Sequence, residues 1–247
     1  MKILTRDKIL FLMTAIVLLL TATCIGSDPE DIEDDVKDGP KYLGTKLEVK
    51  GEQVWMPNYN TGKVSELLLK FAGDRDVGVI VDYPSFNKIV SGKIKKGILE
   101  FKIDEGVLEN TYLLDKDNLI SHFFNDWNED NNINITPSDV KGNIITVVTY
   151  KSDANPIEAV IREGFSGTDN SLTGEYIYYL YVDNNCKISA GKVEKTDLDY
   201  TFNKFDLDLK AGWNTICKRE TYTTTGKSSY SISLSNPSIR WVIQKIK

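Results

Sequence analysis

Hydrophobic and polar residues alternate over most of the chain beyond position 45. In segment 97–103, Leu99, Phe101 and Ile103 alternate with Ile98, Glu100 and Lys102, which is the pattern of a strand with one buried face. Clusters of Gly, Asn, Asp, Pro and Ser separate many short segments of this kind. The pattern predicts strands at 46–55, 64–72, 77–83, 88–93, 97–103, 110–114, 143–150, 158–163, 175–182, 187–194, 200–209, 214–222, 229–234 and 240–246. In 200–209 the alternation changes phase, which predicts a bulge near Asn203.

One segment has a helical period instead. The apolar residues of 115–127 recur at the spacing of one helix face, and they are Leu119, Ile120, Phe123, Phe124 and Trp127. We therefore expect a short amphipathic helix with Asp117 or Asn118 as its N-cap. The whole pattern predicts a mostly β fold, an antiparallel β-sandwich with one short helix. A barrel or two small β subdomains divided near residue 140 remain open, because segment 128–137 is polar enough for a linker or long loop.

The first 23 residues differ in character from the rest. Lys2, Arg6 and Lys8 precede an uncharged apolar stretch from Ile9 to Leu20, which is the order of a secretory signal peptide. The stretch is shorter than the roughly 20 residues that a helix needs to span a bilayer. We therefore expect export and removal of residues 1–23.

Cys24 follows the small residues Ala22 and Thr23 at the end of this apolar stretch. The segment Leu20-Thr21-Ala22-Thr23-Cys24 resembles a lipobox, although Thr21 and Thr23 replace the commoner Leu and Gly or Ala. The resemblance implies cleavage before Cys24, acylation of that cysteine with a diacylglycerol and a further chain such as palmitate, and a stable membrane anchor. The alternative is an ordinary secretory signal cut near Ala22.

Residues 24–44 are predicted to form a tether between this anchor and a β domain at 45–247. The segment is rich in Asp and Glu and poor in apolar residues, so it cannot offset the entropy cost of ordering. Without residues 1–23, which hold three basic residues and one acidic residue, 27 basic and 35 acidic residues remain, a net charge of −8. Nucleic acid is an unsuitable partner for such a chain, because phosphate binding needs a basic face.

The C-terminal region carries a wider resemblance. The segments Leu207-Asp208-Leu209-Lys210-Ala211-Gly212-Trp213-Asn214-Thr215 and Ile239-Arg240-Trp241-Val242-Ile243 look like the closing strands of uncharacterised spirochaete-like envelope lipoproteins. The resemblance covers roughly the last fifty residues and the signal region, and it implies a lipid-anchored protein of the bacterial cell envelope. We expect Gly212 to allow a tight turn, and Trp213 and Trp241 to anchor the core.

Acylation of Cys24 would leave two cysteines, Cys186 and Cys217, in a compartment that permits disulfides. They could form a bridge. Cys217 lies at even spacing from Trp213 on a predicted strand, however, so a buried thiol in the core is the equal alternative.

The best metal candidate is the loop that starts at Asp126. Its oxygen-bearing residues occupy the first alternate positions of a calcium loop, and they are Asp126, Asn128, Asp130 and Asn132. Asn131 stands where such a loop has Gly, and Pro137 stands where it has a bidentate Glu. Any calcium affinity is therefore expected to be weak, and a simple connecting loop is the favoured interpretation.

Catalytic motifs are sparse. His122 is the only histidine, so it is the only base for a Ser-His or Cys-His arrangement, and its place in the predicted helix favours an exposed residue. The tyrosines of 176–181 predict a strand with one core face and one face that could present aromatic rings to a glycan or protein. We expect a non-catalytic binding or structural lipoprotein of the cell envelope, with an envelope glycan hydrolase that uses a carboxylate pair as the alternative.

Overall fold

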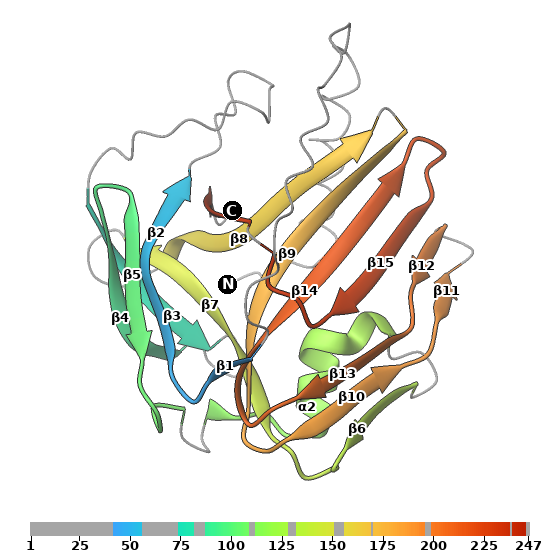
Figure 1. The fold of residues 1–247 in the computed structure, drawn as a ribbon, viewed down its shortest axis with the longest axis horizontal. Coiled ribbons are helices and arrows are strands. Elements are labelled where there is room, and N and C mark those ends of the chain that lie inside the picture. Colours follow the sequence, from blue (N-terminus) through green and yellow to red (C-terminus); the bar gives the residue numbers. More distant parts are fainter. Residues whose placement is uncertain are drawn as a thin grey trace, which may run out of the picture.

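The computed structural model is built almost entirely of β-strands (Figure 1). It describes residues 42–55, 74–81, 87–108, 112–127, 132–150, 156–168, 170–195, 199–237 and 239–245. The strands are β1 (Tyr42–Gly44), β2 (Leu47–Trp55), β3 (Arg75–Val81), β4 (Asn87–Lys95), β5 (Ile98–Ile103), β6 (Ile133–Thr136), β7 (Gly142–Tyr150), β8 (Pro156–Thr168), β9 (Ser171–Val182), β10 (Cys186–Ala190), β11 (Val193–Lys195), β12 (Tyr200–Phe202), β13 (Phe205–Leu209), β14 (Gly212–Thr223), β15 (Ser228–Ser233) and β16 (Arg240–Lys245).

The longest helical segment in the described residues joins three short turns. It begins with the α-helical turn α2 (Lys116–Leu119), widens to a π-helical turn (Ile120–Phe124) and ends in a 3₁₀ turn (Asn125–Trp127). The predicted N-cap, Asp117 or Asn118, was wrong. Asp115 caps the helix, because its extended backbone lets its carboxylate accept a hydrogen bond from the Asn118 N–H at 3.0 Å.

Part of the largest sheet closes into a barrel of eight strands. The strands pair in the order β7-β3-β4-β5-β2-β16-β8, β8 then pairs with β7, and β9 enters where β7 and β8 separate. Strand β16 pairs in parallel with β2 and antiparallel with β8, so it joins two parts of the chain that are far apart in sequence. Apolar side chains fill the interior, including those of Val79, Leu99 and Trp241.

The alternation predicted for 97–103 is confirmed. Leu99, Phe101 and Ile103 point into the barrel and are buried, while Glu100 and Lys102 face outward. Trp213 and Trp241 also lie in this core, as expected. Gly212 has a φ of +112°, and a Cβ there would lie 2.6 Å from the carbonyl oxygen of Gly44. Glycine at 212 therefore lets β1 approach the start of β14 closely.

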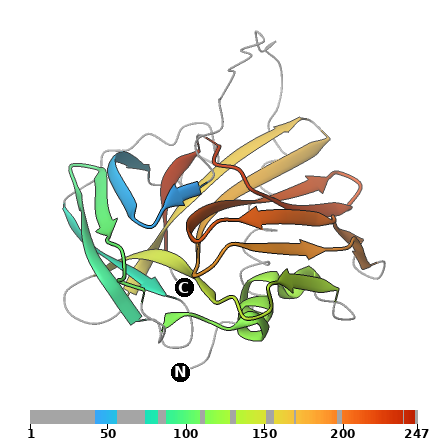
Figure 2. The ribbon, with the colours of Figure 1, turned by 60° about the horizontal axis from the view of Figure 1, so that its bottom comes forward.

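The rest of the large sheet forms a second half with two layers (Figure 2). Beyond the barrel it continues as β9-β14-β15-β12-β11, and a three-stranded sheet, β13-β10-β6, and the helical segment share its hydrophobic core. Trp127 closes this core by packing edge-on against Phe202 and Phe205, and its indole N–H donates to the carbonyl oxygen of Asn203 at 2.8 Å. The mostly β fold with one short helix is thus confirmed. The eight closed strands form the barrel that the sequence analysis kept as an alternative to the sandwich. The second half of the molecule has two packed layers.

Strand β9 lies between the two cores. Ile177 and Tyr179 belong to the barrel core, whereas Leu180 and Val182 belong to the other core. Tyr176 and Tyr179 are buried, and the Tyr178 ring packs edge-on against Phe123 at 5.2 Å. Tyr176 and Tyr179 are therefore closed to a ligand, whereas Tyr178 and Tyr181 are half-buried, and a ligand for this strand stays a prediction. Residues on both sides of position 140 contribute to each core.

Several boundaries differ from the predicted strands. Segment 200–209 is not one strand with a bulge, because at Asn203 the chain leaves β12 in the large sheet and starts β13 in the three-stranded sheet. Segment 187–194 likewise divides into β10 and β11. Part of the predicted loop at 128–137 forms β6. Of 110–114, the described residues contribute a single bridge, Leu114 to Gly142, and the strand predicted at 64–72 lies outside the described residues.

Among the residues that the structure describes, no helix has the length and hydrophobicity to cross a bilayer. The predicted signal peptide, Cys24 and most of the predicted tether also lie outside these residues, so they stay predictions.

Candidate functional site

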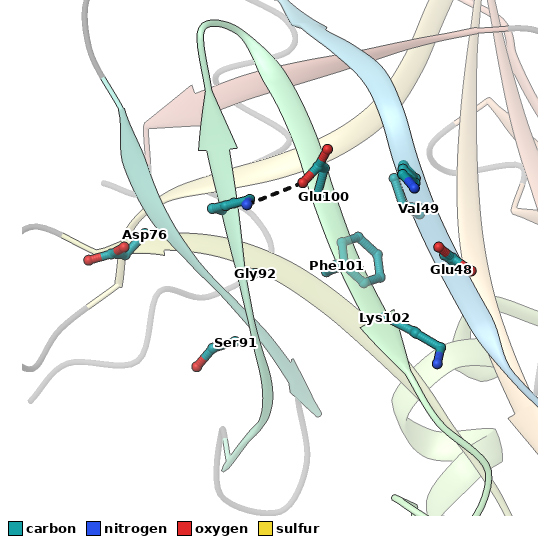
Figure 3. A pocket seen from close by; sticks show the side chains of 10 residues that line it. Glu48, Val49, Asp76, Ser91, Gly92, Glu100, Phe101 and Lys102 are labelled. Carbon is teal, nitrogen blue, oxygen red and sulfur yellow. Dashed lines mark ion pairs between the residues drawn. The ribbon is translucent and has the colours of Figure 1, made fainter.

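A groove opens in the barrel wall where the hairpin of β4 and β5 splits (Figure 3). The two strands pair through only three residue pairs, from Lys93–Glu100 to Lys95–Ile98. Both strands continue past this point, and each stays paired with its other neighbour, β3 or β2. The groove between them has a volume of about 510 Å³, in the range of ligand sites.

Local sequence explains the geometry of this hairpin. Lys96 and Gly97 both have positive φ, 51° and 79°, as a tight two-residue hairpin turn requires. Gly92 marks the end of the pairing. A Cβ at this position would lie 2.6 Å from the carbonyl oxygen of Glu100 and 2.7 Å from the Cβ of Phe101, so the close contact of the strands depends on glycine.

Charged side chains form the rim of the groove on the outer face of the barrel. Nearest the turn, one row across four strands alternates in sign, and its members in register are Lys50, Glu100, Lys93 and Asp76. The Nζ of Lys93 lies 3.4 Å from a carboxylate oxygen of Glu100. In the next row Glu48 of β2 pairs with Lys102 of β5 on one side of the groove. On the other side, Gly78 of β3 pairs with Ser91 of β4. The groove separates Lys102 from Ser91.

Lys102 also contacts the end of its own strand. Its Nζ lies 2.7 Å from Oδ1 of Asp104, and this hydrogen bond raises the pKa of Lys102 and lowers the pKa of Asp104. Both side chains are exposed, so this pair contributes little to stability. Lys102 therefore carries a positive charge at the rim at neutral pH.

The floor of the groove is less polar. Val49 and Phe101 are buried beneath it. The groove therefore combines an apolar floor, charged rims and two strand edges, which together suit a ligand that has both apolar and charged groups.

A second polar cluster lies inside one end of the barrel. The carboxylate of the buried Glu158 accepts a hydrogen bond from the Thr149 hydroxyl at 2.8 Å and lies 3.3 Å from Nε of Arg75. Thr149 is fully buried. The cluster compensates the burial of Glu158, and we assign it a structural role.

Arg162 is also held inside the barrel wall. Its guanidinium stacks over the Trp241 ring at 5.9 Å and donates to the Tyr179 hydroxyl at 3.0 Å and to Oδ1 of Asn236 at 2.8 Å. It also donates to the carbonyl oxygen of Pro237 at 3.3 Å. These contacts fix the chain that precedes β16 against β8.

A third cluster lies on the face of β14 that also carries Ile216 of the layered core, beside Tyr230 of β15. Glu220 lies 3.1 Å from the Lys218 Nζ and accepts a hydrogen bond from the Tyr222 hydroxyl at 2.7 Å. Burial, and then the nearby carboxylate of Glu220, raise the pKa of Tyr222. Because Glu220 is held by two partners, it is poorly placed to act as a general acid or base.

The predicted calcium loop lies mostly outside the described residues. Asn128 and Asp130 are not described, nor is the side chain of Asp126. Asn132 is described, and its Oδ1 accepts a hydrogen bond from the Gly191 N–H at 3.3 Å. No group of three or more His, Cys, Asp or Glu side chains among the described residues could hold a metal ion. The calcium site stays a prediction.

The two cysteines lie in different cores. Cys186 is a buried thiol of the layered half, whereas Cys217 is a buried thiol of the barrel. Burial, with smaller contributions from Asp183 and Asp208, raises the pKa of Cys186 to about 11. His122, the one histidine of the chain, is exposed on the helical segment.

Sequence reasoning missed the groove. The alternating charges around it have the same pattern as the wet face of any strand, and only Gly92 marks the place where two strands meet closely. Comparisons with protein-family models, with curated proteins and with solved structures found no match to this chain.

Proposed function

We propose that this chain is a lipid-anchored protein of the bacterial cell envelope that binds a partner without catalysis, through the groove between β4 and β5. The groove itself carries the proposal. It is open, of ligand size, and lined by charges of both signs over an apolar floor. Inside the barrel, by contrast, apolar side chains fill the space among the described strands.

The sequence supports the anchor. The basic and then apolar N-terminus, the lipobox-like segment ending at Cys24 and the acidic stretch after it have the order found in exported lipoproteins. An acylated Cys24 and a tether of about 20 residues would hold the β domain near a membrane surface with its groove accessible to other envelope components.

The described carboxylates favour binding over hydrolysis. A glycosidase needs two carboxyl groups across a cleft, about 5 to 10 Å apart, one of them ready to give a proton. Around the groove, Glu100 pairs with Lys93 at 3.4 Å, and Glu48 lies in register with Lys102. Each of these two carboxylates therefore has a basic side chain beside it.

The test combines intact mass with localisation. Membrane-extracted protein should have the mass of a chain that starts at Cys24 plus its acyl chains, and a Cys24→Ala variant should lose the acyl mass and the membrane fraction. A Cys186→Ala variant, matched in chemistry but inside the fold, should keep both. An unmodified chain cut near Ala22 would contradict the anchor.

Binding is tested separately by crosslinking on intact cells. A photoreactive residue at Ser91, on the rim of the groove, should capture an envelope protein, whereas the same residue at exposed Lys227, on the β14–β15 turn, should not capture it. Equal capture at both positions would contradict a binding role for the groove.

A further inference from the structure

We infer that the groove binds an extended peptide segment of a partner protein, which adds as a strand between β4 and β5 and carries acidic residues on its outer face. This inference rests on the binding role proposed for the groove. It names the class of ligand and the way in which the ligand is held.

The first argument is the state of the two strand edges. Past Lys93 and Glu100 no pairing joins β4 to β5 among the described residues, although both strands remain extended and paired on their far sides. Residues 88–91 and 102–103 therefore turn edges toward each other across the groove, which closes where Gly92 contacts Glu100 and Phe101. An unpaired edge presents backbone N–H and C=O groups at the spacing of a strand. An inserted peptide would meet such groups on both of its sides.

The second argument is the order of charge around the opening. In the complete row, charges alternate from strand to strand, so each side chain has an opposite charge beside it. In the row that the groove interrupts, Glu48 lies beside Lys102. On its other side, Lys102 has no paired residue on β4. An acidic residue of an inserted strand would continue the alternation there, at the distance at which cross-strand pairs interact.

The third argument concerns the inner face. The neighbours of an inserted strand on this side would be Phe101 and Ile103 from β5 and the half-buried Val90 from β4. Apolar residues would therefore suit the inward positions of the ligand. Because side chains alternate along a strand, the ligand segment in the groove should have acidic and apolar residues in alternation. This is strand addition, in which backbone bonds give affinity and side chains give selectivity.

The experiment uses the full chain in detergent and three fluorescein-labelled seven-residue peptides. The first is acetyl-Glu-Val-Glu-Val-Glu-Val-Glu-amide, the second has Lys in place of Glu, and the third is the first with N-methyl groups on its valines. We expect fluorescence anisotropy to show binding of the first peptide and at least about tenfold weaker binding of the other two, because repulsion and blocked N–H groups each remove a required contact.

Two variants separate the groove from general charge. Lys102→Glu should weaken binding of the Glu peptide by about tenfold, since attraction becomes repulsion, and should improve binding of the Lys peptide. Lys95→Glu makes the same charge change near the turn, away from the groove lining, and should change affinity by less than about twofold. Circular dichroism of both variants verifies that they fold.

Other outcomes would overturn the inference. Equal binding of the N-methylated peptide would exclude strand addition, and no binding of any peptide would exclude this ligand class. If replacing the acidic residues of 28–38 by their amides raised affinity for the Glu peptide more than about tenfold, the chain's own acidic segment would be the occupant instead. If the protein proves to be acylated and membrane-bound but the peptide does not bind, only this inference is overturned. If the chain proves to be unacylated but binds the peptide, only the proposed anchor is overturned.

Discussion

Replacement of Trp241 by alanine should destabilise the protein strongly. The Trp241 side chain is only 3% exposed, stacks on Tyr179 with centroids 6.0 Å apart, and meets Phe101 edge-on at 6.3 Å. The Arg162 guanidinium covers it at 5.9 Å. Truncation of a buried aromatic side chain to alanine costs about 3–5 kcal/mol, from lost transfer free energy and the cavity that remains. The loss of a stacked and an edge-on partner places this site near the upper end, at about 4 kcal/mol.

The assay is urea unfolding followed by far-ultraviolet circular dichroism. A loss of about 4 kcal/mol is a large part of the 5–15 kcal/mol by which ordinary domains are stable, so the midpoint should fall clearly. Trp55→Ala is the matched control. Trp55 is half-buried, with the Arg240 guanidinium over its ring at 4.7 Å, so its removal should cost only about 1–2 kcal/mol.

The same experiment tests whether the two cores unfold together. Strands β9 and β14 contribute to both cores, so damage to the barrel should also reach Trp127, which lies in the layered half. Tryptophan fluorescence, which then comes from Trp55, Trp127 and Trp213 together, should therefore change in one transition at the same urea concentration as the circular dichroism signal. A cost below about 2 kcal/mol, or a separate later transition of the fluorescence, would refute this account of the core.

Three further predictions concern single groups. Gly92→Ala should cost about 1–3 kcal/mol in urea unfolding, because its Cβ would collide with Glu100 and Phe101, whereas Ser91→Ala beside it should change stability by less than about 0.5 kcal/mol. Thr149→Val should cost about 1–3 kcal/mol, since it removes a hydrogen bond to the buried Glu158, and an unchanged midpoint would show that this bond contributes nothing net. The pKa of Cys186 is raised from 9.0 to about 11, so the folded state holds this proton more tightly than the unfolded state. The stability that comes from this raised pKa is present below pH 9 and should be lost as pH rises toward 11. The Cys186→Ala variant should therefore lose less stability over this pH range than the unchanged protein. An identical pH profile for the two proteins would contradict this prediction.

Much of the strand content follows from local pattern. In β5 the alternation of apolar and charged residues fixes which side chains enter the core, because a strand has only two faces. The same reasoning places Trp213 and Trp241 in the core. It works there because each inward residue meets a neighbour that is equally apolar.

Local pattern does not reveal which strands become neighbours. The place of β16 between β2 and β8 depends on contacts across most of the chain, which no short window of sequence contains. Strand β9 was ambiguous for a related reason. Its sequence left open how far its tyrosines are buried, because tyrosine has an apolar ring and a polar hydroxyl, and contacts from both halves of the molecule bury Tyr176 and Tyr179.

The candidate groove escaped prediction because it arises from missing pairing. Lys93, Glu100 and Lys102 have the composition of a solvated face whether or not the strands beside them stay together. Only the register reveals that pairing stops after three residue pairs. The end of β12 at Asn203 was marked in the sequence by a change in the phase of hydrophobic alternation. The same change is expected for a bulge within one strand and for a chain that moves to another sheet.

The position of β16 in the barrel also bears on when the protein can fold. Its partners β2 and β8 meet only through it, so the ring cannot close until the ribosome has made the segment that ends at Lys245. Closure then joins residues nearly two hundred positions apart, and such non-local contacts slow folding relative to a protein held together by local contacts. If the proposed signal peptide directs export through a membrane pore, the barrel would remain open during transport and β16 would complete it only afterwards.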